Sequence, residues 1–203
     1  MSRSTNPEPT RARQLLISAV VLLNAILTVG CAGPLFRVKP VVELPPLGNN
    51  VKTATAEGLT LNVAPPLTDE ESQELFEANL PLSGIAPVRL EILNTNQIAL
   101  ELKKARFSVH DSEGRDWKLL SLKQTISRIM KANNIYAYNP RSRKQFEAEF
   151  RAYGLDLKTP LAASERRQGF LFFQTPNKDP VTGSKGLVLQ VEKLQQPVQV
   201  VLN

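Results

Sequence analysis

Short runs of alternating apolar and polar residues are the feature of this sequence that most restricts its fold. The runs are 59–63, 88–92, 98–102, 107–109, 117–119, 187–191 and 198–202. Successive side chains of a β-strand point to opposite faces, so each run predicts a strand with one face in the core. Residues 168–174 contain four consecutive apolar residues, which predicts a central strand covered on both faces. The chain is therefore expected to be mainly β.

Two polar segments predict turns between these strands. Residues 94–96, Asn-Thr-Asn, separate two alternating runs and suit a hairpin. Residues 111–114 place Asp at the first and Gly at the fourth position, which suits a type I turn. Both turns predict strands that are antiparallel neighbours.

Three helices are expected among the strands, and each has a capping-box pattern at its start. In this pattern a hydroxyl and a side chain three residues later satisfy free backbone N–H groups reciprocally. The pairs are Thr68 with Glu71, Ser121 with Gln124, and Ser142 with Gln145. Apolar residues at helical spacing follow each pair, so we expect these helices to pack against the core.

The N-terminus has the build of an export signal. Three arginines precede residues 15–30, a run without charged side chains. The run is shorter than the roughly 20 apolar residues of a spanning helix, and small residues end it just before Cys31. We therefore predict a signal peptide over residues 1–30.

The end of this run resembles the lipobox of bacterial lipoprotein precursors, in which a small residue precedes a cysteine that is acylated. Gly30 and Cys31 match that pattern and Val29 is acceptable, whereas Thr28 stands where leucine is usual. The resemblance implies that an acylated Cys31 becomes the mature N-terminus and anchors the protein in a membrane, which a diacylated residue does stably. Because the next residue is alanine rather than the aspartate retention signal, it also implies the outer membrane, facing the periplasm, if the source has two membranes.

An uncleaved membrane anchor is the alternative. Residues 15–36 would then span the membrane as one tilted helix, and Cys31 would stay a free thiol. Gly30, Gly33 and Pro34 argue against this alternative because they interrupt a helix where it would have to continue.

The remaining chain is expected to form one domain. The whole sequence has 203 residues, of which 42% are hydrophobic and 22% charged, and this composition suits a globular domain with accessory segments. The strand pattern resembles the immunoglobulin-like domains of bacterial envelope lipoproteins, so we expect an antiparallel immunoglobulin-like β-sandwich over 59–203 with a helical insertion at 121–157. The prolines and glycines of 31–58 predict a tether, or alternatively an edge strand near 41–44.

The sequence offers little raw material for catalysis or metal binding. Its one histidine is His110 and its one cysteine is Cys31, so a serine or cysteine triad would have to use His110. His110 falls on the polar side of a strand, beside a turn. The carboxylates of 111–116 lack the spacing of an EF-hand and include Arg115 among them. Because no phosphate-binding glycine motif appears either, we predict no catalytic site, metal, cofactor or nucleic-acid partner.

Positive charge gathers in one segment. Residues 115–144 contain eight basic side chains and one acidic side chain. We predict a surface for an acidic envelope protein, an anionic lipid or an anionic polymer. Its candidate residues are Tyr136, Tyr138, Arg141, Arg143 and Lys144. The alternative is that this segment pairs within the fold with the acidic residues of 69–77.

These observations favour a non-catalytic, lipid-anchored envelope protein that acts as a structural or interaction module. Two other functions stay open. A carrier would enclose a lipid or another apolar ligand, and an apolar cavity larger than ordinary packing voids would favour it. A hydrolase would need a deep cleft that gathers His110 with carboxylates.

Overall fold

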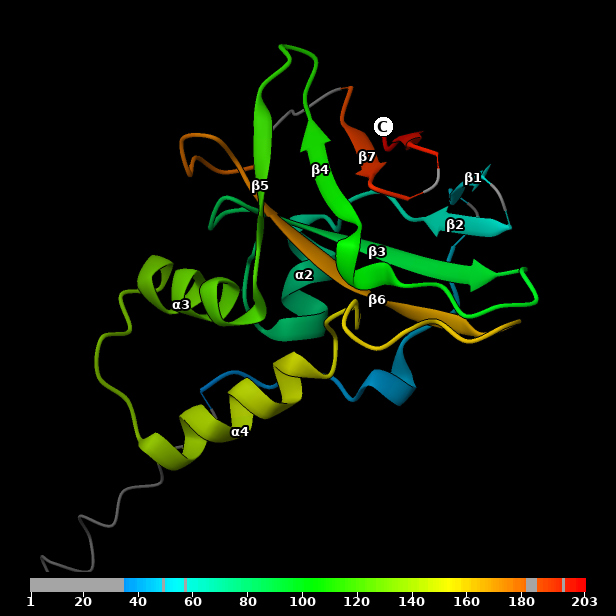
Figure 1. Cartoon of the computed structure of the whole chain (residues 1–203). Coiled ribbons are helices and arrows are strands. Elements are labelled where there is room, and N and C mark those ends of the chain that lie inside the picture. The colour runs from blue at the N-terminus through cyan, green and yellow to red at the C-terminus, as the bar shows by residue number, and fades with distance from the viewer. Residues whose placement is uncertain (1–34, 49, 57, 182–185, 195) are drawn as a thin grey trace, which may run out of the picture. The chain divides into compact units, whose positions relative to one another are not determined.

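The computed structural model in Figure 1 describes residues 35–48, 50–56, 58–181, 186–194 and 196–203. The predicted signal peptide and the predicted lipobox with Cys31 lie outside these ranges. Within them, the strands are β1 (Lys52–Ala56), β2 (Leu59–Val63), β3 (Ile85–Asn94), β4 (Arg106–His110), β5 (Asp116–Leu120), β6 (Arg166–Gln174), β7 (Val188–Glu192) and β8 (Val198–Val201). The helices are α2 (Asp69–Phe76), α3 (Leu122–Ala132) and α4 (Pro140–Arg151), with short 3-10 helices η1 (Val41–Glu43) and η2 (Leu102–Lys104).

The described strands form one antiparallel sheet in the order β1-β2-β3-β6-β5-β4-β7-β8. Its two edge strands, β1 and β8, also contact each other, so the sheet curls round until its ends meet. The mainly β, antiparallel part of the prediction is confirmed, and three α-helices accompany the sheet. The immunoglobulin-like arrangement is not confirmed, because these strands belong to one continuous sheet rather than two.

Two hydrophobic cores lie on the two faces of the sheet. The inner core fills the space that the curled sheet encloses, and it includes Leu61, Leu90, Val109, Phe173 and Leu189. The outer core lies between the sheet and the helices, which Figure 1 shows gathered on one side of β3 and β6. It includes Phe76, Ile129, Phe146, Phe150 and Phe172. The helices therefore cover a sheet face that would otherwise expose aromatic side chains to water.

Strand β6 is central, as its composition predicts, because it pairs with β3 on one side and β5 on the other. Leu171 and Phe173 point into the inner core, whereas Phe170 and Phe172 point into the outer core. A strand with a core on each face needs apolar residues at every position, and this need explains the unbroken apolar run.

Two of the three predicted helix starts are confirmed. The capping boxes of Thr68 and Ser121 both form, and they begin α2 and α3. The third was wrong, because α4 begins at Pro140 with Asn139 as its N-cap. Asparagine caps as well as serine, and proline suits the first helical position, so the helix begins before Ser142 is reached.

The predicted strand over residues 98–102 does not form. Leu100 makes an isolated bridge to Leu161, and Leu102 begins η2. The hairpin predicted at residues 94–96 is absent for a physical reason: β3 already has β2 and β6 as neighbours, so neither of its edges can accept another strand. Asn94 instead closes a loop, and its side-chain amide donates to the carbonyls of Ile98, Leu161 and Ala162.

The described part of the predicted tether is folded. Phe36 is buried, and its ring lies 5.1 Å from that of Phe146 in α4. The Lys39 N–H donates to the Leu75 carbonyl at 2.9 Å, and the hydroxyl of Tyr153 donates to the Lys39 carbonyl. The alternative prediction of an edge strand near 41–44 is also wrong, because η1 occupies this position. Irregularly spaced apolar residues can each enter the core separately, which a search for periodicity misses.

Strand β1 also lies in the range predicted as tether, and it pairs with β2 along its whole length. This part of the range is therefore folded as well. In the ranges that the structure describes, no helix is both long and apolar enough to cross a membrane. Most of the alternative anchor at 15–36 lies outside those ranges, but Phe36 at its end belongs to the outer core.

Candidate functional site

His110 belongs to a small polar cluster on the outer face of the β4–β5 hairpin. Its Nδ1 atom lies 2.5 Å from Oδ1 of Asp116, its partner across the hairpin. Its Nε2 atom lies 3.3 Å from Oγ of Ser108. Serine, histidine and aspartate therefore stand in the order that acyl-transfer enzymes use.

The carboxylate of this cluster differs in its exposure from that of an acyl-transfer triad. The Asp116 side chain is 78% exposed, whereas serine hydrolases bury the carboxylate that orients their histidine. A substrate also needs a concave site with donors for the developing oxyanion, and the pocket described below includes none of the three residues. We interpret the cluster as a cross-strand contact between His110 and Asp116 with a neighbouring serine.

The carboxylate of Asp111 organises the predicted turn at 111–114. The Gly114 N–H donates to the Asp111 carbonyl at 2.9 Å, which closes the turn. The carboxylate accepts from the N–H groups of Glu113 and Arg115, from Nε of Arg115 and from Nε1 of Trp117. Burial opposes ionisation, but these hydrogen bonds outweigh it and lower the pKa of Asp111 to about 2. Among the described residues, no group of His, Cys, Asp and Glu side chains is arranged to hold a metal ion.

The candidate partner residues lie on the loop after α3 and on the first turns of α4. Arg141, Arg143 and Lys144 are exposed, and the side chain of Tyr136 is 79% exposed. Tyr138 differs from them because it packs against the outer core. Four of the five predicted residues are thus exposed, and together with exposed Lys131 at the end of α3 we call them the basic face.

The basic face is not neutralised by the acidic helix. In α2, Glu74 pairs with Lys39, and Glu77 accepts the backbone N–H of Arg37. Arg143 pairs with Glu147 of its own helix at 3.0 Å. Within the ranges described, Lys131, Arg141 and Lys144 form no ion pair. Among the described residues, no ion pair joins the segment 115–144 to the acidic residues of 69–77.

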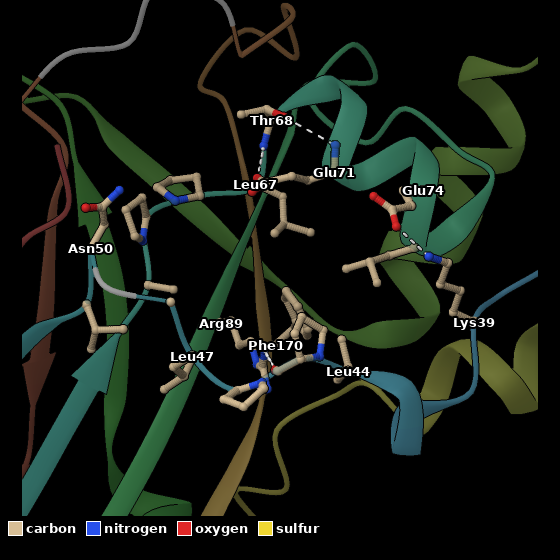
Figure 2. Close-up of a pocket in the computed structure, with 18 of the residues that line it drawn as sticks. Lys39, Leu44, Leu47, Asn50, Leu67, Thr68, Glu71, Glu74, Arg89 and Phe170 are labelled. Atoms are coloured by element: carbon tan, nitrogen blue, oxygen red, sulfur yellow. Dashed lines mark hydrogen bonds and ion pairs between the residues drawn. The ribbon is translucent and has the colours of Figure 1, made fainter.

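A pocket of about 620 Å³ lies on the outer side of β3 and β6 (Figure 2). One wall is the chain from η1 to β1, and the opposite wall is the loop 64–68 with one side of α2. Hydrogen bonds fix this loop to β3, because the N–H groups of Ala64 and Leu67 donate to the carbonyls of Arg89 and Pro87 at 3.0 Å. Four prolines and four leucines line the pocket. Its volume falls in the range of about 300–1,000 Å³ typical of small-molecule sites.

Arg89 and Phe170 form the floor of this pocket, where β3 and β6 pair. Arg89 is only 7% exposed. Its Nη1 donates to the Pro45 carbonyl at 2.7 Å, and its Nη2 donates to Oε1 of Gln168 at 3.1 Å. Burial lowers the pKa of Arg89, but a guanidinium remains charged in proteins. The floor therefore carries a buried positive charge.

Comparisons with known proteins give no information about this site. No family model matches the sequence. No curated protein matches it either. A solved structure similar in part is a conserved hypothetical protein from Bacillus anthracis, with 11% identity and a TM-score of 0.37 over 73% of this chain and 92% of that one. An uncharacterized beta-sandwich protein from Clostridium difficile 630 has 8% identity and a TM-score of 0.35 over 75% and 90%. At these scores the likeness carries no argument about this chain.

The sequence analysis did not predict the pocket, because none of the lining segments has an unusual local pattern. Arg89 occupies an outward position of an alternating strand, where arginine is common. The wall formed by residues 43–48 and 50–51 falls in the range predicted as tether. The pairs Pro45-Pro46 and Pro65-Pro66 are the local signal that could have drawn attention, because consecutive prolines stiffen the backbone on both sides of the pocket.

Proposed function

We propose that this protein is a lipid-anchored envelope protein without catalytic function, whose domain acts as an interaction module at the membrane surface. Acylated Cys31 would be the anchor, after removal of residues 1–30. The observation that carries the proposal is an exposed basic face on the helix against which the chain packs just after the anchor.

The link between anchor and domain is short. Four residues lead from Cys31 to Leu35, and a chain spans at most about 3.6 Å per residue, so the link reaches about 14 Å. Phe36 packs on Phe146 of α4. Attachment at Cys31 would therefore keep α4 within reach of the lipid headgroups, far closer than a tether ending at residue 58 would allow.

The basic face suits an anionic membrane surface. Lys131, Arg141 and Lys144 are exposed, and each basic residue near such a surface contributes about 1 kcal/mol of binding free energy. Tyr136 adds an exposed aromatic ring, which is favoured at the interface between lipid and water. We therefore take anionic lipid headgroups as the partner of this face, ahead of an acidic protein or polymer.

The anchor is tested by the intact mass of the protein extracted from membranes. We expect a chain that begins at a diacylated or triacylated Cys31, because the lipobox resemblance implies cleavage before this residue. In the Cys31→Ala variant this mass should disappear and the mature form should be lost from the membrane fraction. A full-length, unacylated wild-type protein would contradict the proposal and would favour the spanning anchor.

The basic face is tested in the anchored protein by charge reversal. A fluorescent probe on Ala137→Cys, reconstituted in vesicles with anionic lipid, should be quenched by headgroup spin labels, because the face lies against the bilayer. Reversal of Lys131, Arg141 and Lys144 to Glu should abolish most of this quenching, as should high salt. A matched reversal of exposed Lys103, Lys104 and Lys158 should leave it unchanged. Equal quenching in both triple variants would contradict membrane docking by this face.

A carrier is the second candidate function, and the pocket favours it. A volume of about 620 Å³ lined largely by leucine and proline exceeds ordinary packing voids, which rarely hold more than one water molecule. The carrier would bind a lipid or another apolar ligand while the anchor keeps it at the membrane. Both functions are compatible, because the basic face and the pocket use different residues.

A further inference from the structure

We propose that the pocket binds a single-chain amphiphile with a carboxylate head group, and that the carboxylate pairs with Arg89. This inference rests on the carrier function and names the ligand class that such a carrier would select. It follows from the partners of Arg89, from the distribution of charge with depth, and from the apolar walls.

Arg89 is a buried cation whose hydrogen-bond partners are neutral. It donates to a backbone carbonyl and to a side-chain amide, at Pro45 and Gln168. In the described ranges no carboxylate lies within ion-pairing distance of Arg89. A buried charge normally has a counter-charge, because desolvation without one is costly. Glu91 acts on Arg89 only at longer range, so a ligand carboxylate would supply the direct ionic partner that Arg89 lacks among the described residues.

The acidic residue closest in sequence is already engaged. Glu91 lies two positions along β3, where it accepts a hydrogen bond from Nδ2 of Asn62 at 3.0 Å and pairs with Arg166 at 3.7 Å. Each of the terminal nitrogens of Arg89 carries a second N–H group, and a guanidinium can bind a carboxylate through two parallel hydrogen bonds. Arg89 is thus held in place by its neutral partners while its charge remains available.

The acidic lining residues Glu43, Glu71 and Glu74 are exposed, with Lys39 beside them, whereas the floor of the pocket carries the cation Arg89. Glu71 and Glu74 line it from α2 and are exposed, whereas Arg89 is almost fully buried (Figure 2). Both glutamates also have partners, because Glu71 caps α2 through the Thr68 N–H and Glu74 pairs with Lys39. An anionic head group would therefore be stabilised more at the floor, beside Arg89, than at the mouth. This arrangement favours a ligand that inserts its carboxylate first.

The walls between mouth and floor suit an unbranched apolar body. Leu44 and Leu47 lie on one side and Leu67 on the other, each half-buried, so a ligand chain would cover apolar surface that water now contacts. Covering such surface contributes about 25 cal/mol per Å². Phe170 closes the floor beside Arg89, which leaves the guanidinium as the charged group there.

Calorimetry on the full anchored protein in nanodiscs tests this inference, with heats from empty nanodiscs subtracted. The probes are octanoate, 1-octanol and octylamine, which share a chain and differ in head group. We expect octanoate to bind at least about tenfold more tightly than octanol, because a charge-assisted pair is lost with the alcohol. Arg89→Gln should weaken octanoate binding to the level of octanol and leave octanol unchanged. Arg37→Gln, which removes an exposed arginine outside the pocket, should change neither affinity.

A second variant keeps the test decisive if Arg89→Gln lowers stability. Ala64→Phe adds a ring to the pocket wall and leaves Arg89 intact, so it should weaken both octanoate and octanol. Undiminished octanoate binding in this variant would place the ligand elsewhere and overturn the inference. Equal affinities of the three probes in the wild type would overturn the carboxylate preference but keep the carrier function. Failure of all three probes to bind would overturn both.

Discussion

Replacement of Phe172 by alanine is expected to lower the free energy of unfolding by about 3–5 kcal/mol, the range for a buried Phe→Ala change. Phe172 is 1% exposed on the central strand β6. Its ring centroid lies 5.1 Å from that of Phe150, 6.2 Å from that of Phe170 and 6.4 Å from that of Phe76. Truncation would leave a cavity between the sheet and the helices α2 and α4. The cavity would persist because neither helix can move into it without shifting the other helix. Chemical denaturation of the full protein measures the change.

Two control variants define what this result means. Phe172→Leu keeps most of the side-chain volume and should lower the free energy of unfolding by much less than the alanine change. Leu82→Ala removes a side chain that is 62% exposed and should shift it by under about 0.5 kcal/mol. A Phe172→Ala protein as stable as the Leu82→Ala protein would show that the aromatic cluster does not hold the helices on the sheet.

Replacement of Gly169 by alanine is expected to lower the free energy of unfolding by about 1–3 kcal/mol, the usual cost of overpacking. A Cβ atom at this position would lie 2.5 Å from Cα and 2.6 Å from the nitrogen of Leu155. The backbone near Leu155 cannot retreat easily, because the Phe170 N–H donates to Tyr153 at 2.7 Å and the Phe170 carbonyl accepts from Leu155 at 3.1 Å. Thermal unfolding followed by circular dichroism measures the loss.

The matched control is Gly48→Ala. A Cβ atom on Gly48 would meet nothing within 4 Å, so this change should leave the melting temperature nearly unchanged. If both glycine variants melted at the same temperature, the close approach between β6 and the chain after α4 would not be a packing constraint.

Residues 35–48 connect the two proposals physically. Their first part follows Cys31 and packs on α4, whereas their last part forms a wall of the pocket and accepts a hydrogen bond from Arg89 through Pro45. A change in the position of this segment would therefore affect the distance of the domain from its anchor and the shape of the pocket together.

The sequence by itself determined most of the secondary structure. The alternation in residues 59–63, 187–191 and 198–202, and the apolar run of β6, predict strands that form, because a side chain's face follows directly from its position in a strand. The capping boxes of Thr68 and Ser121 are local in the same way, since all their hydrogen bonds lie within three residues. The lipobox resemblance at Cys31 also depends on sequence alone, and it stays a prediction.

Only the tertiary structure decided which strands pair and where the candidate sites lie. Leu100 alternates like a strand residue, but β2 and β6 had already occupied both edges of β3. Phe36 and Lys39 resemble linker residues in the sequence. In the structure they contact α4 and α2, respectively, at residues more than 30 positions away. The burial of Arg89 also depends on long-range contacts. Pro45 and Phe170 lie far from it in the sequence and come next to it only in the folded protein. Such long-range contacts leave no local pattern, because each residue's partner is set by the arrangement of the whole sheet.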